Sequence, residues 1–208
     1  MASVSTTAVA KSELRKAIAA KIQQLSSEEI TRQSNAVYEQ LIQKREFQNA
    51  SRVSVYLSTS TELDTTKILE VMFQSNKSVF VPRFKKGCRT MEMLKLNSMS
   101  DYNSLPETMW HIKQPALDDD TRENVMTKGS LELMLMPGVA FTINGHRLGH
   151  GGGFYDRYLN EYSRQFGCTP KTIGLALNEQ IVDTIPMTET DFVIDEVLAE
   201  KIANNQSK

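Results

Sequence analysis

The sequence lacks the marks of several large classes of protein. It has no run of about 18 apolar residues, so no segment is long enough to span a bilayer as a helix. Its two cysteines, Cys88 and Cys168, have no CxxC spacing, which favours idle thiols in a reducing compartment over a disulfide framework or a zinc site. A formal net charge of -1 gives no electrostatic argument for binding nucleic acid or an acidic membrane. We therefore expect a globular protein with neither nucleic-acid nor membrane partners.

The first ten residues also lack the pattern of a signal peptide. Residues 1–10 have neither a basic start nor a continuous apolar core, and the cytoplasm is therefore the predicted location. The same residues are rich in Ser, Thr and Ala and contain no acidic residue, which leaves a mitochondrial transit peptide as an alternative, although they contain no Arg either. We expect residues 1–10 to be disordered.

The order of apolar patterns along the chain predicts the fold class. A length of 208 residues favours one domain spanning residues 1–208. Residues 97–130 show no sustained period and are expected to form long loops laid over the sheet. Because strands alternate with helices, we predict an α/β fold with three α/β/α layers and a mostly parallel sheet. The predicted helices are 11–24, 27–44, 65–74 and 155–166, and the predicted strands are 52–57, 78–82, 91–96, 131–136, 172–177 and 193–198.

The chain has only ten glycines, and five of them fall within residues 145–153. Glycines so close together leave backbone N–H groups free to wrap an anion, and the helix that follows adds the positive end of its dipole. Arg147 adds a full positive charge to the same loop. The segment matches neither a P-loop nor a Rossmann fingerprint. A phosphate-binding loop is therefore predicted, with a flexible surface turn as the alternative.

Two carboxylates are candidates for holding a metal ion. Asp156 follows the glycine cluster and offers a hard oxygen ligand for Mg2+, although a carboxylate near the positive end of a helix explains it equally well. Asp191 is a second candidate, for which an N-cap or turn position is the commoner explanation. His146 and His150 are four residues apart, but the glycine between them argues against a zinc pair on a helix. No Ser, Cys or His has the sequence context of a catalytic nucleophile.

Other polar residues have plain structural explanations when the pattern is considered alone. Lys11 and Arg15 fit the solvated face of an N-terminal helix. Glu62 fits a loop carboxylate, and Trp110 fits a packing residue. Nothing in the periodicity assigns these residues to a site.

A combination of motifs nevertheless resembles the 5-formyltetrahydrofolate cyclo-ligase family. The motifs are Lys-x-x-Leu-Arg at residues 11–15, Pro-Gly at residues 137–138, and Arg-Leu-Gly-His-Gly-Gly-Gly-Phe-Tyr-Asp at residues 147–156. The resemblance covers nearly the whole chain, and it also includes residues 56–58 leading to Glu62, residues 81–83, residues 110–115 and residues 191–196. The long glycine segment is its most specific part.

The resemblance implies ATP- and Mg2+-dependent conversion of 5-formyltetrahydrofolate, with or without a polyglutamate tail, to 5,10-methenyltetrahydrofolate. The formyl oxygen would be phosphorylated, N10 would attack the activated carbon, and ADP and phosphate would be released. A monomer is expected, with Arg147 and Tyr155 as its catalytic residues. The resemblance assigns ATP to Lys11, Arg15, Arg147, Gly149, His150, Gly151, Gly152, Gly153, Phe154 and Tyr155, the folate to Leu57, Glu62, Trp110, His150, Gly152 and Phe154, and Mg2+ to Asp156 and Asp191.

Two other functions remain open at the level of sequence. A sugar-phosphate isomerase-like protein would use the same anion loop without ATP, and a non-catalytic folate- or phosphate-binding protein would bind without turnover. Some members of the family carry other residues at positions 150, 152 and 154, which leaves the contacts of those positions open. From the sequence alone, Asp156→Asn is expected to abolish ATP turnover with little loss of fold.

Overall fold

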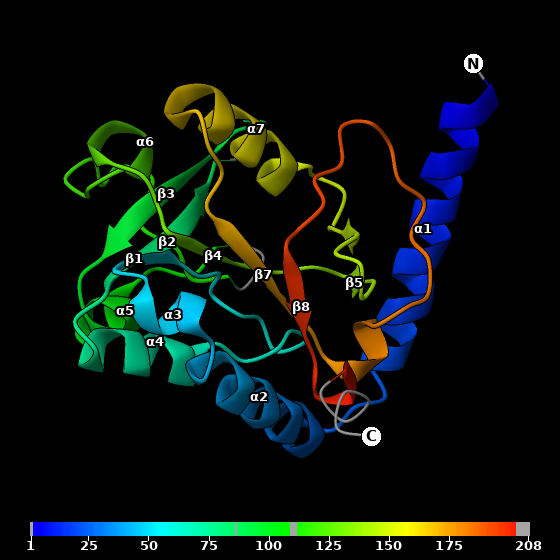
Figure 1. Cartoon of the computed structure of the whole chain (residues 1–208), viewed down its shortest axis with the longest axis horizontal. Helices are drawn as coiled ribbons and strands as arrows, with labels where there is room; N and C mark the ends of the chain where they lie inside the picture. Colours follow the sequence, from blue (N-terminus) through cyan, green and yellow to red (C-terminus); the bar gives the residue numbers. More distant parts are fainter. Residues whose placement is uncertain (1, 86, 109–111, 203–208) are drawn as a thin grey trace.

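A six-stranded sheet forms the centre of the molecule, with the strand order β3-β2-β1-β4-β7-β8 (Figure 1). The computed structural model of the chain describes residues 2–85, 87–108 and 112–202. All neighbouring strands run parallel except β2 and β3, which are antiparallel. The predicted α/β class with a mostly parallel sheet is confirmed. The strands are β1 (Arg52–Ser54), β2 (Ser78–Phe84), β3 (Met91–Leu96), β4 (Leu133–Met136), β7 (Lys171–Leu175) and β8 (Glu196–Leu198).

Successive side chains of a strand point to opposite faces of the sheet, and in this sheet both faces are apolar. In β4, Leu133 and Leu135 belong to one core cluster, whereas Met134 and Met136 belong to the other. Each face is covered by helices, as Figure 1 shows, and this produces the predicted three layers. The first cluster includes side chains of α1 (Ala2–Ile22), α2 (Ser27–Ile42) and α4 (Thr66–Gln74), and the second includes those of α7 (Phe154–Phe166).

Local sequence signals account for most helix boundaries. The Ser26 hydroxyl caps α2 by accepting a hydrogen bond from the Glu29 amide at 3.2 Å. Helix α7 ends at Gly167, whose φ of 70° is the left-handed conformation common at helix C-termini. The prediction for α1 was wrong at its start, because the helix begins at Ala2, so residues 2–10 are helical instead of disordered. Residues 6–10 of this segment are exposed or half-buried, and Val9 is 55% exposed, so they show no apolar period.

Short elements account for the other differences from the sequence prediction. Two helices interrupt the predicted loops of residues 97–130, and they span six and four residues, too few to show a period. Side chains define their starts, since Ser98 accepts from the Asp101 amide and Asn124 from the Met126 amide, each at 3.0 Å. The additional elements are α3 (Arg45–Asn49), α5 (Met99–Ser104), α6 (Val125–Lys128), β5 (Ala140–Phe141), β6 (Arg147–Leu148) and the 3-10 helix η1 (Asn178–Gln180).

The strand order places a crevice between β1 and β4. The chain passes from β1 through α4 to β2 on one side, while β4 pairs with β1 on the other side. The loops that leave the carboxyl ends of β1 and β4 therefore diverge, and ligands of open α/β sheets bind at such a switch point. Within the described ranges, no helix has the length and apolar character required to cross a membrane.

Candidate active site

The glycine loop enters the site from a two-stranded hairpin. Strands β5 and β6 pair antiparallel, with Phe141 opposite Arg147, so the hairpin fixes the backbone of Arg147 just before the glycines. Helix α7 begins after Gly153, which adopts a left-handed φ of 62°. A side chain there would be strained, and its Cβ would lie 2.8 Å from an Arg157 nitrogen. The loop therefore needs glycine at this position to turn into the helix.

Two adjoining cavities meet at this loop. The apolar cavity, of about 280 Å³, lies at the carboxyl ends of β1, β2 and β4, and the polar cavity, of about 350 Å³, lies between the loop and α1. Both are lined by Arg147, Gly149, Gly153 and Asp156, so the same short segment forms a wall of each. The apolar cavity is also lined by Tyr56, Leu57, Glu62, Phe84, Phe154 and Tyr155, and the polar cavity by Lys11, Arg15, Gly151, Thr188, Thr190 and Asp191.

Arg147 and Asp156 form an ion pair between the cavities. The Arg147 side chain is only 3% exposed, and its Nη2 donates to both Asp156 oxygens at 3.0 and 3.1 Å. Its Nη1 reaches the Pro137 carbonyl at 3.3 Å, whereas Nε is buried without a partner among the described residues. Asp156 also accepts from the Phe192 amide at 3.2 Å. The guanidinium therefore depends on Asp156 for most of its hydrogen bonding.

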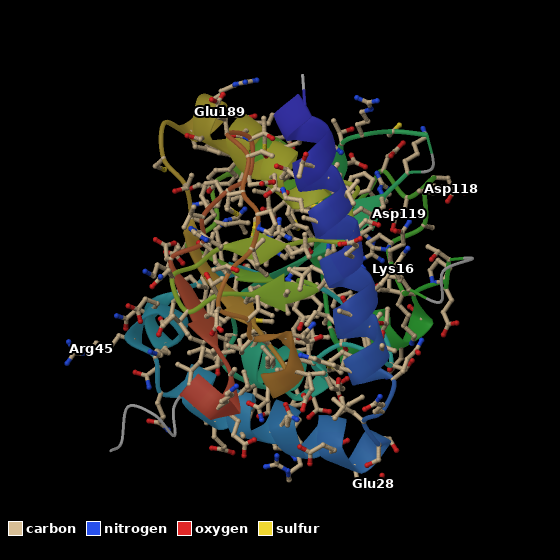
Figure 2. All side chains as sticks on the ribbon, turned by 90° about the vertical axis from the view of Figure 1, so that its right-hand side faces the viewer. Lys16, Glu28, Arg45, Asp118, Asp119 and Glu189 are labelled. Carbon is tan, nitrogen blue, oxygen red and sulfur yellow. The ribbon has the colours of Figure 1, made fainter. Side chains whose placement is uncertain are left out.

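Helix α1 closes one side of the polar cavity. Lys11 forms a short ion pair with Asp191, and Arg15 Nε donates to the Gly149 carbonyl at 2.8 Å. Burial raises the pKa of Asp191, but hydrogen bonds from Lys11 and the Thr188 amide lower it by more, and the net pKa is below the ordinary value. Figure 2 shows α1 running across this side of the molecule, with Lys16 on its surface. Lys11 and Arg15 thus have specific partners and are not merely solvated.

Glu62 provides an ionised carboxylate in the apolar cavity. Its Oε2 accepts from the Thr59 amide at 2.9 Å and from the Thr59 hydroxyl at 3.0 Å, while Oε1 lies 3.6 Å from His150 Nε2. Burial raises the pKa of Glu62, but the nearby His150 and the hydrogen bonds from Thr59 outweigh that effect, so the net pKa lies below the ordinary value. An ionised carboxylate can only accept hydrogen bonds. It therefore suits a ligand that presents N–H donors.

The Tyr155 hydroxyl is a buried donor beside the same cavity. It has no hydrogen-bond partner within the described part of the chain, and its residue is 7% exposed. Burial, followed by the negative charge of Glu62, raises the pKa of Tyr155 far above its ordinary value. The phenol therefore stays protonated at neutral pH and can donate a proton in a hydrogen bond but cannot act as a base. A buried unpaired hydroxyl costs about 1–3 kcal/mol, which a ligand oxygen would offset.

The polar cavity holds the two carboxylates proposed for Mg2+. Asp156 and Asp191 both line it, each beside a cationic partner. No group of three or more His, Cys, Asp or Glu residues within the described ranges could hold a metal ion by itself. Mg2+ in nucleotide sites is held by one or two carboxylates together with phosphate oxygens and water. The donor set therefore fits a metal ion that arrives with a phosphate ligand and not a permanently bound one.

The structure brings the sequence-predicted residues together but divides them between the cavities. Gly151 lines the polar cavity, whereas His150, Gly152, Phe154 and Tyr155 line the apolar one. Leu57 and Glu62 line the apolar cavity, and Trp110 lies outside the described residues. Cys88 and Cys168 are free and exposed. Sequence reasoning missed further lining residues, because they belong to α1, to β2 or to loops that meet the glycine segment only in the folded chain. These residues are Tyr56, Thr59, Phe84, Thr7, Thr188 and Thr190.

The mostly parallel sheet has a cavity at its switch point, and a glycine loop leads into the helix beside that cavity. These features define the class of α/β proteins that bind small molecules. The model of the 5-formyltetrahydrofolate cyclo-ligase family matches residues 7–200. The chain belongs to this family.

Individual relatives are similar over nearly their whole length. A probable 5-formyltetrahydrofolate cyclo-ligase of Caenorhabditis elegans is 43% identical over 191 residues, covering 91% of this chain and 92% of the relative. The 5-formyltetrahydrofolate cyclo-ligase of Mus musculus is 38% identical and covers 92% and 94%. The solved structure of 5,10-methenyltetrahydrofolate synthetase of Aquifex aeolicus superposes with a TM-score of 0.73 at 28% identity, covering 92% of this chain and 90% of that protein. The similarity therefore extends across both cavities.

Proposed function

We propose that this protein converts 5-formyltetrahydrofolate to 5,10-methenyltetrahydrofolate with hydrolysis of ATP to ADP and phosphate. The observation that carries the proposal is the pair of cavities separated by one glycine loop. One cavity has the apolar rings and the Glu62 carboxylate suited to a pterin, and the other has cations and a glycine loop suited to phosphates. A reaction that transfers a phosphoryl group to a folate needs both ligands to meet at a shared wall.

The reaction proceeds in two steps, and neither step requires a nucleophile from the protein. The formyl oxygen attacks the γ-phosphorus, forming an O–P bond as the bond to the ADP oxygen breaks. N10 then attacks the activated formyl carbon, loses its proton, and expels phosphate as the methenyl ring closes. The protein contributes positioning and charge neutralisation, which is how phosphoryl transfer is generally catalysed.

The residues of the polar cavity supply that neutralisation. Lys11, Arg15 and Arg147 place three cations around it, opposed by the two carboxylates Asp156 and Asp191. The start of α7 adds the positive end of a helix dipole. Asp156 and Asp191 would hold Mg2+, whose chemical contribution is to offset charge on the phosphate oxygens. Lys11 would exchange part of its pairing with Asp191 for a phosphate oxygen.

The residues of the apolar cavity orient the folate. Glu62 would accept hydrogen bonds from the amino and ring N–H groups of the pterin, since its carboxylate is ionised and faces the cavity. Leu57 and Phe154 offer apolar surface to the ring system. Tyr155, protonated at neutral pH, would donate to a folate oxygen and thereby gain the partner that its hydroxyl lacks.

The direct test is an absorbance assay for the methenyl product with 5-formyltetrahydrofolate, ATP and Mg2+. We expect product only when ATP is present, and activity on sugar phosphates without nucleotide would instead favour the isomerase-like alternative. Lys11→Ala should raise the KM for ATP, and Glu62→Gln the KM for folate, each by about tenfold to a hundredfold for a lost charge-assisted hydrogen bond. Lys16→Ala is the matched control, because this exposed lysine of α1 lines neither cavity (Figure 2). Folate binding without ATP consumption by the wild-type protein would overturn the proposal.

We further propose that the protein acts as a monomer in the cytoplasm and accepts folates with a polyglutamate tail. Two exposed free cysteines support a reducing compartment. Exposed large apolar side chains of the described residues are limited to Val9, Leu117, Ile143 and Val193, which supports a monomer. Light scattering of the purified protein tests the oligomeric state. KM values for mono- and polyglutamylated substrates test whether the protein accepts the polyglutamate tail.

A further inference from the structure

Arg157 makes a set of contacts that the reaction described above does not use. This residue lies in the first turn of α7, directly after Asp156. Its Nε donates to the Arg89 carbonyl at 2.7 Å, and its Nη2 makes a short hydrogen bond to the Gly152 carbonyl. One guanidinium therefore joins two backbone segments that are 63 residues apart in the chain.

Both segments joined by Arg157 continue into walls of the apolar cavity. Arg89 belongs to the connection between β2 and β3, and β2 ends at Phe84, which lines the cavity. Gly152 belongs to the glycine loop and lines the same cavity. The rings of Phe84 and Phe154 meet edge to face with centroids 5.0 Å apart, and the Arg157 guanidinium lies 5.6 Å from the centre of the Phe154 ring. Arg157 thus braces the place where the two walls meet.

The glycine loop depends on such a brace because its backbone is intrinsically free. Residues 151–153 are all glycine, which loses more conformational entropy on ordering than any other residue. The missing side chain of Gly153 leaves the space that the guanidinium occupies, since a Cβ there would lie 2.8 Å from Arg157 Nη1. A planar guanidinium can donate in two directions at once, which an ammonium does less well. The local sequence therefore provides both the flexible loop and the side chain that orders it.

Resting on the proposed function, we infer that Arg157 is a positioning residue for the folate, acting by locking the glycine loop to the β2–β3 connection. It touches neither the reacting atoms nor the polar cavity, since it lines neither pocket. Its loss lets Gly152 and Phe154 move relative to Phe84 and loosens the apolar cavity. The polar cavity is held independently by the Arg15 contact with Gly149, so the binding of ATP is preserved.

The test compares the kinetics of Arg157→Ala, Arg157→Lys and the wild type. Arg157→Ala should raise the KM for 5-formyltetrahydrofolate by about tenfold, the effect expected when one hydrogen-bonded support is lost, with a much smaller change in kcat and in the KM for ATP. Arg157→Lys should give an intermediate KM, because one of the two carbonyls can still be reached. Arg164→Ala, at an exposed position near the end of the same helix, is the control and should leave all three constants unchanged.

Hydrogen exchange gives a readout that does not depend on turnover. In Arg157→Ala, the amides of residues 87–90 and of residues 149–154 should exchange faster together, while β4 and β7 keep their protection. An unchanged folate KM, or a fall in kcat at unchanged KM, would overturn the role of Arg157. Unchanged exchange in either segment would overturn the link itself. A wild-type protein without turnover would instead overturn the proposed function, so the two failures are distinguishable.

Discussion

Replacing Asp156 by Asn tests the ion pair that separates the two cavities. In the wild type, the Arg147 side chain is 3% exposed and donates two of its three hydrogen bonds to Asp156. The Asn side chain has nearly the same shape but no charge, and it leaves a buried guanidinium without a counter-ion. Removing one partner of a buried pair costs about 3–5 kcal/mol. Asp156 is 20% exposed and Asn retains one acceptor, so we expect about 2–3 kcal/mol.

This cost predicts a measurable loss of thermal stability as well as of activity. For a chain of this size, each kcal/mol corresponds to about 2–4 °C in Tm, so Asp156→Asn should unfold about 4–12 °C earlier at pH 7. From the sequence alone, Asp156→Asn is expected to leave the fold almost unaffected. The structure changes this expectation, because the sequence does not reveal that Arg147 is buried against Asp156. Glu161→Gln, an exposed carboxylate on the same helix, is the matched control and should shift Tm by no more than about 2 °C.

A double variant separates the structural role of Asp156 from its proposed role in ATP binding. Arg147→Met combined with Asp156→Asn removes the buried cation together with its partner, so Tm should recover relative to Asp156→Asn alone. Methenyl formation should remain abolished, because both residues line the polar cavity. Calorimetry gives Tm, and the absorbance assay gives turnover. An Asp156→Asn protein with wild-type Tm would refute the buried-charge argument, and one with wild-type turnover would refute the placement of Asp156 in the ATP site.

Two further predictions concern a hydroxyl and a surface network. Tyr155→Phe removes a buried hydroxyl that has no partner among the described residues, so Tm should not fall. The KM for folate should rise about tenfold. A lower Tm would contradict this interpretation. Arg122→Met removes bonds of 2.6 and 2.7 Å to Asp101 and one of 2.7 Å to Asp119, which should lower the free energy of unfolding at pH 7 by about 2–3 kcal/mol. The Arg122 hydrogen bond holds the pKa of Asp101 below its ordinary value, so this stabilisation is present above about pH 4 and is lost as pH falls through the lower folded pKa. The difference in urea midpoint between the two proteins should therefore shrink at pH 3, and an equal difference at pH 3 and pH 7 would exclude the carboxylate as its cause.

The parts of the fold that the sequence predicts well are those with strong local patterns. Strand β3 occupies the predicted residues 91–96, and α7 begins at the glycine cluster and ends at Gly167. The start of α1 escapes prediction because residues 6–10, which are exposed or half-buried, show no apolar period. The contacts of Arg157 escape prediction for another reason. They join segments that are distant in sequence, and no local pattern encodes their meeting.

The glycine segment is divided residue by residue between the two cavities. Of the two adjoining cavities, His150, Gly152 and Phe154 line the apolar one and Gly151 lines the polar one, while Gly149 and Gly153 line both. The backbone turns within the loop, with φ of 103° at Gly151 and 62° at Gly153, so neighbouring residues reach different cavities. The segment 147–156 is therefore better understood as a partition with two faces than as one continuous ATP-binding motif. Substituting position 150, 152 or 154 should therefore change the KM for the folate more than the KM for ATP.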